Sequence, residues 1–202
     1  MTLREIKQTS PERFTLIFDD GTELKTTLGI ITGRFIRSGM DFDEEAYNEL
    51  VSASGLAMAK ARALRIINAR PMSREELRKR LIEKGETPEN AEDCADWLCR
   101  MGLINDAEYA GSVVRHYAAK GYGSARIKQE LRRHGVPREM WDEVMLQMPE
   151  QDAYLERFIR SRLHDPGDRA QVKKVSDALV RRGYSWEQKK HALNEFDTQG
   201  DY

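Results

Sequence analysis

The chain has 202 residues, of which 33 are Lys or Arg and 34 are Asp or Glu, so its formal net charge is −1. That balance argues against a strongly basic nucleic-acid-binding protein. No apolar run reaches the roughly 20 residues of a membrane-spanning helix, and the N-terminus carries no apolar signal segment, so we expect a cytoplasmic protein.

Residues 1–40 are predicted to form a small β-containing module. Phe14–Phe18 is rich in β-branched and aromatic residues, Asp20-Gly21 is a strong hairpin signal, and Glu23–Leu28 alternates as a returning strand. A third strand is predicted at Leu3–Lys7. Because a hairpin alone is marginally stable in water, we expect a short helix to cover it, although the module could also be a loose appendage. The helix should end at Gly39 and contain Leu28, Ile30, Ile31, Phe35 and Ile36.

Residues 41–56 are predicted to form a linking helix with Asp41 or Asp43 as its cap. Gly55 either breaks this helix or weakens it. The alanine-rich stretch from Leu56 to Ala69 is predicted to be a separate helix. It ends at Arg70, because the residue before a proline is pushed out of the helical region.

The next stretch, residues 73–85, has a clear helix start and a clear helix stop. Ser73 and Glu76 form a capping box. Leu77 and Leu81 share one face of the helix. Gly85 then ends the helix, because glycine takes the left-handed conformation without a steric penalty.

The same pattern recurs twice downstream. Leu131 precedes Gly135 and Leu179 precedes Gly183 by four residues, and the three leucines are 50 and 48 residues apart. This register predicts three repeats of three helices each, at 57–102, 103–149 and 150–197, with a frayed tail at 198–202. The fold class is therefore mainly α, with a small N-terminal β-meander.

Charge is distributed unevenly within the predicted repeats. The middle helices (73–84, 124–134 and 172–182) hold 13 basic and 5 acidic residues, whereas the helices that follow them (89–101, 138–148 and 186–197) hold 4 and 10. Either these solvated faces neutralise each other, or the basic ones form a stripe that faces an acidic partner. The candidates for partner binding are Arg74, Arg78, Lys79, Arg126, Lys128, Arg132, Lys173, Lys174 and Arg181.

Residues typical of catalysis or metal binding do not cluster in the sequence. The four histidines have no carboxylate or cysteine at ligand spacing, and there is no P-loop or dinucleotide fingerprint. Cys94 and Cys99 are expected to be small buried or half-buried side chains. Tyr122 is expected to be exposed in a glycine hinge. Core-like helical positions are taken by Tyr109, Tyr117, Trp141, Tyr154, Phe158 and Trp186, and most of these are expected to pack in the core and not to stack on bases. We therefore expect a protein that is not an enzyme and has no metal or cofactor.

Several motifs resemble those of the RecX family, regulators of the RecA recombinase. Residues 70–77 look like the family pattern R-x-x-S-x-x-E-L, and residues 102–110 match G-L-[IL]-[ND]-D-x-x-[FY]-A. Residues 181–184 match the R-R-G-[FY] of the third repeat. One departure is Glu86-Thr87, where an aromatic residue often follows the glycine. The residues that carry family motifs are Arg70, Ser73, Glu76, Leu77, Gly85, Asp106, Tyr109, Ala110, Gly123, Leu131, Gly135, Arg182 and Gly183.

The resemblance implies a binding protein. Its repeats would form an elongated curved array that lies, as a monomer, in the groove of the RecA filament on single-stranded DNA. It would inhibit the recombinase, ATPase and co-protease activities of RecA, and so reduce recombination and the SOS response to DNA damage. The basic stripe would face the filament, with a weak direct contact to DNA. Two alternatives stay open: a helical-repeat protein that acts directly on nucleic acid, and a helical scaffold for a different protein.

Overall fold

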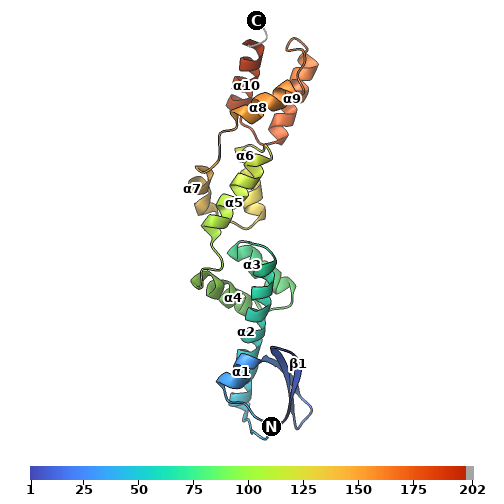
Figure 1. Cartoon of the computed structure of the whole chain (residues 1–202), viewed down its shortest axis with the longest axis vertical. Helices are drawn as coiled ribbons and strands as arrows, with labels where there is room; N and C mark the ends of the chain where they lie inside the picture. Colours follow the sequence, from blue (N-terminus) through green and yellow to red (C-terminus); the bar gives the residue numbers. More distant parts are fainter. Residues whose placement is uncertain (199–202) are drawn as a thin grey trace. The chain divides into compact units, whose positions relative to one another are not determined.

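A three-stranded sheet followed by ten α-helices and one 3-10 turn makes up residues 1–198, which the computed structural model describes (Figure 1). This confirms the predicted fold class of a mainly helical chain with a small N-terminal sheet. The chain divides into two compact units, Met1–Ile104 and a second that starts at Asn105. The limits of the individual repeats stay predictions. Residues 199–202, in the predicted frayed tail, lie outside the described residues, whereas Thr198 still belongs to the last helix.

The sheet is an antiparallel meander with the strand order β1-β2-β3. Its strands are β1 (Leu3–Ser10), β2 (Arg13–Phe18) and β3 (Glu23–Thr27). Leu16 of the central strand lies opposite Ile6 on one side and Leu24 on the other. Gly21 closes the β2–β3 turn at φ 83°, a conformation that glycine adopts without strain.

The sheet packs on the helix α2 (Glu44–Ala69), so the module is not a loose appendage. Leu3, Leu16 and Phe18 are buried together with Leu50 of α2. On the same helix, the buried Ser54 hydroxyl donates to the hydroxyl oxygen of Thr26 at 2.9 Å. Ser54 is one turn beyond Leu50, so a single face of α2 carries the sheet.

The covering helix differs from the prediction. Helix α1 (Leu28–Gly33) ends well before Gly39, and Arg34 is its C-cap. Phe35 then takes φ 50° and its side chain is 85% exposed, whereas the next residue, Ile36, enters the core. A tight left-handed turn thus sends the two neighbouring side chains to opposite sides, and the prediction that Phe35 and Ile36 belong to the covering helix was wrong.

Helix α2 is continuous, so the prediction of a separate linking helix at 41–56 was also wrong. Asp43, not Asp41, is the N-cap, and it accepts a bond from the Ala46 backbone N–H at 2.8 Å. A glycine inside a helix costs roughly 0.5–1 kcal/mol. The helix passes through Gly55 because α2 buries side chains on both sides of it, Leu50 and Ser54 before it and Ala59 and Ala63 after it.

The far half of α2 forms a three-helix bundle with α3 (Arg74–Glu83) and α4 (Pro88–Arg100). Small residues of α2, Ala59 and Ala63, let the helices approach closely, and they pack in one core with Leu77, Leu81 and Leu98. As predicted, the Ser73 hydroxyl accepts the Glu76 N–H at 3.1 Å and so caps α3.

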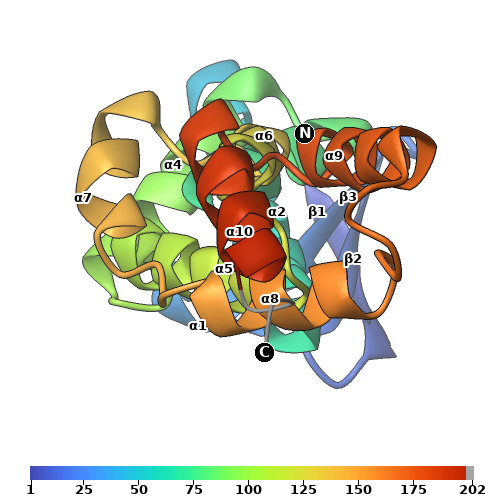
Figure 2. The same cartoon turned by 90° about the horizontal axis from the view of Figure 1, so that it is seen from above.

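The second unit contains two helical groups. The first consists of α5 (Asp106–Ala119), α6 (Ser124–Arg133), the 3-10 turn η1 (Arg138–Met140) and α7 (Trp141–Met145). The second consists of α8 (Asp152–Arg160), α9 (Arg169–Arg181) and α10 (Trp186–Thr198). Figure 2 shows α8 and α10, which pack against each other, from a second side.

Two expectations for the second unit need correction. Residues 138–148 form only a 3-10 turn and a short helix, because the Trp141 indole N–H bonds to the Val136 carbonyl at 3.0 Å and keeps that segment close to the preceding turn. Trp186, which was placed in the core, is 67% exposed at the start of α10. Its ring is covered on one side by the Lys189 ammonium, 5.0 Å from the centroid.

The three predicted glycine stops are confirmed. Gly85, Gly135 and Gly183 have φ values of 89°, 69° and 88°. In each case the residue after the glycine donates its N–H to the carbonyl of the repeat leucine. These bonds run to Leu81, Leu131 and Leu179 at 3.0, 3.0 and 3.2 Å, the pattern of a Schellman cap. The same leucine side chains are fully buried, so the leucine both anchors the core and closes its helix.

The remaining negative expectations concern membranes and cysteines. Within residues 1–198, no helix combines the length and the apolar character that a bilayer crossing requires. Cys94 is buried and Cys99 is half-buried, as expected from the sequence. Burial raises the pKa of the Cys94 thiol to about 11, which keeps it protonated near neutral pH.

Candidate partner-binding surface

The basic residues of α3 are largely neutralised by acidic neighbours. Arg74 bonds to Asp96 at 3.0 Å through Nε and also to Glu92, both on α4. Arg78 and Lys79 pair with Glu75 at 2.8 and 3.4 Å. The Asp96 and Glu92 hydrogen bonds raise the pKa of Arg74, and the Arg78 hydrogen bond lowers the pKa of Glu75. In the first repeat, therefore, the basic side chains of α3 are neutralised by carboxylates of α3 itself and of α4.

The basic residues of α6 are only partly neutralised. Arg126 and Arg133 both pair with Glu130, at 3.0 and 2.6 Å, and the Glu130 side chain is 5% exposed. Burial alone would raise the pKa of Glu130, but the Arg133 bond and the nearby charges lower it overall. Lys128 lies 3.8 Å from Asp142, a fully solvated carboxylate. Arg132 is exposed and makes no ion pair with any described residue.

The basic residues of α9 are the least neutralised. Lys173, Lys174 and Arg181 are exposed, and none of them has a carboxylate within 4.0 Å in the described part of the chain. Of the nine candidates, four therefore have no carboxylate of the described residues within 4.0 Å, although the charge of Lys174 still helps to lower the pKa of Asp168. All four belong to the second unit: Arg132, Lys173, Lys174 and Arg181.

The turn at residues 121–123 is not a hinge, because it is bonded to the turn at residues 182–184. The Gly123 N–H donates to the Arg182 carbonyl at 2.8 Å, and the Ala125 N–H donates to the Gly183 carbonyl at 3.1 Å. The Tyr184 hydroxyl donates to the Gly121 carbonyl at 3.2 Å. We call these two bonded turns the repeat joint.

The repeat joint depends on glycine because the two backbones nearly touch. A Cβ on Gly123 would lie 2.5 Å from the Gly183 oxygen, and a Cβ on Gly183 would lie 2.3 Å from the Arg126 nitrogen. Arg182 adds two bonds from Nη1, to the carbonyls of Lys120 and Gly121 at 3.2 and 3.3 Å. Three of the family-motif residues, Gly123, Arg182 and Gly183, thus meet here. Tyr122, predicted to be exposed, is half-buried beside the joint.

The other family-motif residues have local structural roles. Arg70 pairs with Glu76, which follows the Ser73 cap. The Tyr109 hydroxyl bonds to His134 Nδ1 at 3.0 Å, and Ala110 is fully buried in the core of α5 and α6. Asp106 lies in the first turn of α5, where a carboxylate interacts favourably with the helix dipole.

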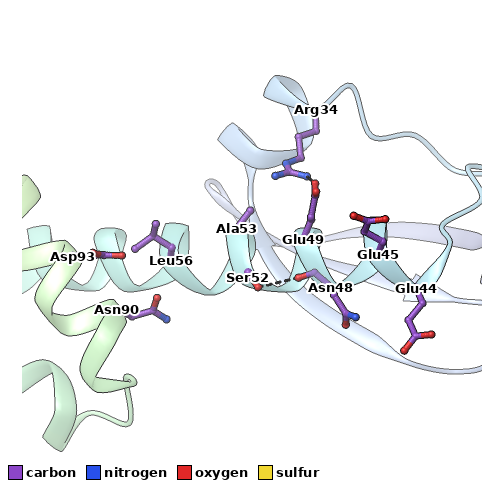
Figure 3. Close-up of a pocket in the computed structure, with 10 residues that line it drawn as sticks. All are labelled: Arg34, Glu44, Glu45, Asn48, Glu49, Ser52, Ala53, Leu56, Asn90 and Asp93. Carbon is purple, nitrogen blue, oxygen red and sulfur yellow. Dashed lines mark hydrogen bonds and ion pairs between the residues drawn. The ribbon is translucent and has the colours of Figure 1, made fainter.

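A wide hollow of about 890 Å³ lies on the first unit, along α2 (Figure 3). Its charged lining is mainly acidic, with Glu44, Glu45 and Glu49 from α2, and Arg34 pairs with Glu49 at 3.6 Å. Ser52 donates its hydroxyl to the Asn48 carbonyl at 2.9 Å, so no base is placed to activate it. In the described chain, no group of three or more His, Cys, Asp or Glu side chains is arranged to hold a metal ion.

The sequence matches known proteins in both units. Residues 59–98 match the model of the first three-helix domain of RecX, and residues 105–145 match that of the second. The regulatory protein RecX of Trichlorobacter lovleyi is 35% identical over 130 residues, which span 60% of this chain and 84% of that protein. The regulatory protein RecX of Halorhodospira halophila is 31% identical over 165 residues, 75% of this chain and 99% of the relative.

Two crystal structures share the fold. One, of a regulatory protein RecX, aligns over 96% of this chain and 98% of its own with a TM-score of 0.73 and 22% identity. The other, RecX from Lactobacillus salivarius, covers 72% of this chain and 99% of its own with a TM-score of 0.64 and 20% identity. At identities of 22% and 20%, the similarity to these two structures supports the fold alone and does not identify binding residues.

Proposed function

The chain belongs to the RecX family of regulatory proteins, and on that premise we propose that it binds the filament of the RecA recombinase on single-stranded DNA and inhibits it. The inhibited activities would be ATP hydrolysis, strand exchange and co-protease function. The protein would act in the cytoplasm, as a monomer, by occupying a surface and without catalysing a reaction.

The four unpaired cations of the second unit support this proposal most directly. Arg132 on α6 and Lys173, Lys174 and Arg181 on α9 are exposed and have no carboxylate within 4.0 Å among the described residues. Surface charges that do not stabilise their own fold remain available for a partner, and they speed its association at low salt. The filament offers acidic protein surface and DNA phosphate to such charges.

The first repeat contributes less in this proposal. Arg74, Arg78 and Lys79 were candidates on the basis of sequence, but each is engaged by Glu75, Glu92 or Asp96. Contact with an acidic partner would have to break those pairs first. We therefore assign the filament-facing surface to α6 and α9, with Lys128 and Arg126 at its margin.

Charge reversal at Arg132 and Lys173 tests the assignment. In the Arg132→Glu/Lys173→Glu variant, the concentration that halves RecA-dependent ATP hydrolysis should rise by about tenfold, as expected for a loss of about 1.4 kcal/mol of binding. The difference from the unchanged chain should shrink as salt is raised from about 50 to 300 mM, because screening weakens exposed charge contacts.

Arg4→Glu/Lys7→Glu is the matched control, because both side chains are exposed cations of β1 and make no ion pair in residues 1–198. This control changes the net charge by the same amount. The concentration at which it halves RecA-dependent ATP hydrolysis should change by less than about twofold. Melting curves by circular dichroism should be alike for both variants. If the control loses inhibition and the α6/α9 variant keeps it, the contact surface is not on these helices.

A further inference from the structure

A groove of about 1000 Å³ lies on the first unit, between α2 and the turn that joins β1 to β2. Its floor is a stripe of α2 side chains that are spaced four, three and four residues apart and so share one side of the helix: Ala57, Ala61, Leu64 and Asn68. A different side of α2 carries Ala59 and Ala63, which are buried in the core with α3 and α4. Helix α2 therefore serves the bundle on one side and the groove on another, and only Leu64 contributes to both among the residues of this stripe.

The opposite wall of the groove is held in place by hydrogen bonds. Leu28, at the start of α1, lines this wall with a side chain that is 44% exposed. The Leu28 N–H donates to the Glu12 carbonyl at 3.2 Å, which ties the β1–β2 turn to α1. The Thr9 hydroxyl donates to the Arg13 carbonyl at 3.1 Å and closes the same turn. Both walls are thus fixed by contacts within the first unit.

The charged lining of the groove is mainly basic. Arg13, Lys60 and Arg65 line it, and none of them has a carboxylate within 4.0 Å among the described residues. Because a helix has 3.6 residues per turn, Lys60 and Arg65 fall on opposite sides of the stripe that forms the floor. Glu12 is the single acidic residue of the lining, and it is exposed. An apolar floor is thus bordered by cations on both sides.

The basic residues of α2 that line the groove differ from their neighbour Arg62. Arg62 pairs with Glu86 at 2.9 Å and donates to the Lys84 carbonyl at 2.6 Å, so it stabilises the bundle. Arg65 bonds only to the Ala61 carbonyl of its own helix, at 3.3 Å from Nε, within the described chain. The Lys60 ammonium lies 5.2 Å from the Trp97 ring centroid, a contact that leaves its charge without a counterion. The cations of the groove therefore remain available to an acidic ligand.

The length of the groove and the spread of its charges favour a peptide over a small anion. Asn68 lies eleven residues beyond Ala57, which is about 17 Å along the axis of α2 and equals about three turns of a second helix. One anionic headgroup would neutralise the cations on one side only. A helix that lays an apolar stripe on the floor presents side chains along both of its edges, so acidic residues there would meet cations on both sides.

We propose that this groove binds an acidic amphipathic helix of a protein partner. Apolar side chains of that helix would cover Ala57 and Ala61, whose small size allows the two helices to approach closely. Its carboxylates would form charge-assisted hydrogen bonds with Arg13, Lys60 and Arg65. The site belongs to the first unit, so it is separate from the cations of α6 and α9 and does not rest on their assignment.

The test measures the fluorescence anisotropy of a labelled peptide of about 14 residues, made of Glu, Leu and Ala with its leucines at helical spacing, on the full chain without recombinase. Arg13→Glu/Arg65→Glu should weaken binding about tenfold at about 50 mM salt and by a smaller factor at about 300 mM, because salt screens the charges. Ala61→Trp should weaken binding about tenfold at both salt concentrations, because the indole fills the floor. A peptide with serine in place of every leucine should bind at least about tenfold more weakly.

The matched control is Arg4→Glu/Lys7→Glu, which reverses two exposed cations of β1 outside the groove. Its affinity for the peptide should stay within about twofold of that of the unchanged chain, and melting curves by circular dichroism should show every variant to be folded. If Ala61→Trp does not fold, the charge-reversal pair alone decides the result.

Three results would overturn the proposal. The first is an absence of saturable peptide binding below about 1 mM. The second is equal weakening by Arg13→Glu/Arg65→Glu and by the control, or equal affinity for a peptide with lysine in place of every glutamate. The third is tighter binding of dodecanoate or of an oligothymidylate than of the peptide, lost in Ala61→Trp, which would assign the groove to a different ligand. Because no recombinase is present, none of these results bears on inhibition of the filament.

Discussion

Gly183→Ala is expected to destabilise the second unit by about 2–5 kcal/mol. The residue has φ 88°, and a left-handed conformation costs a residue with a Cβ roughly 1–2 kcal/mol. The new Cβ would also lie 2.3 Å from the Arg126 nitrogen, a backbone atom that cannot rotate away. Overpacking of this kind typically costs about 1–3 kcal/mol more. The free energy of opening can be measured by native-state hydrogen exchange of amides in α6 and α9.

Gly85→Ala is the matched control for backbone strain. Gly85 has nearly the same φ, 89°, but nothing lies within 4 Å of the position that a Cβ would take. The first unit should lose only about 1–2 kcal/mol, measured on amides of α3. Equal losses in the two variants would show that the repeat joint adds no steric constraint and does not require glycine at position 183.

Leu179→Ala is expected to destabilise the second unit by about 2–5 kcal/mol, the range for a buried leucine whose removal leaves a cavity. Its side chain is fully buried in a cluster with Val175, Phe158 and Tyr184. The carbonyl that closes the helix remains in the variant, so the loss reports on packing and not on the Schellman cap. Hydrogen exchange of α9 amides gives the change in free energy.

Val180→Ala is the matched control for Leu179→Ala, because it lies in the same helix and removes a similar side-chain volume. Val180 is 52% exposed, so its replacement should change stability by no more than about 0.5 kcal/mol. The corresponding changes at Leu81 and Leu131 should resemble that at Leu179, because all three leucines are fully buried before their glycine stops. Losses near zero at all three would mean that the repeat faces were assigned incorrectly.

Local signals account for what the sequence predicted well. The Ser73 cap and the glycine stops each depend on residues within one or two turns, and both are present. The four-residue spacing before each stop identified the buried leucines for the same reason.

Elements whose conformation depends on burial or on one particular contact were predicted less well. Gly55 looked like a helix breaker, but burial on both sides of it keeps α2 continuous. The segment after Pro137 looked like a full helix, but the Trp141 bond to Val136 belongs to a 3-10 turn and a short α7. Phe35 was assigned to the covering helix, whereas it lies after the end of α1 in a left-handed backbone conformation that directs its side chain into solvent.

For the candidate partner-binding surface too, some features could be predicted from the sequence and others could not. Residue counts predicted that the middle helices carry excess positive charge, but not which charges are neutralised. The pairing of Arg74 with Glu92 and Asp96 joins residues 18 and 22 apart in sequence, on different helices. The repeat joint is harder still to predict from the sequence, because the bonds from Arg182 and Tyr184 to Gly121 span 61 and 63 residues. Its one sequence signal is the pair of turns in which a tyrosine adjoins a glycine, at Tyr122 and Tyr184.

The most direct test of the central proposal is the rate of ATP hydrolysis by RecA on single-stranded DNA, measured as the unchanged chain is added. A regulator that occupies the filament should lower the steady-state rate in proportion to its concentration, and more strongly at low than at high salt. Cosedimentation of the chain with the filament in the same samples should rise in parallel. If the rate is unchanged when the chain is in excess over RecA, and the chain does not sediment with the filament, the proposed function is contradicted.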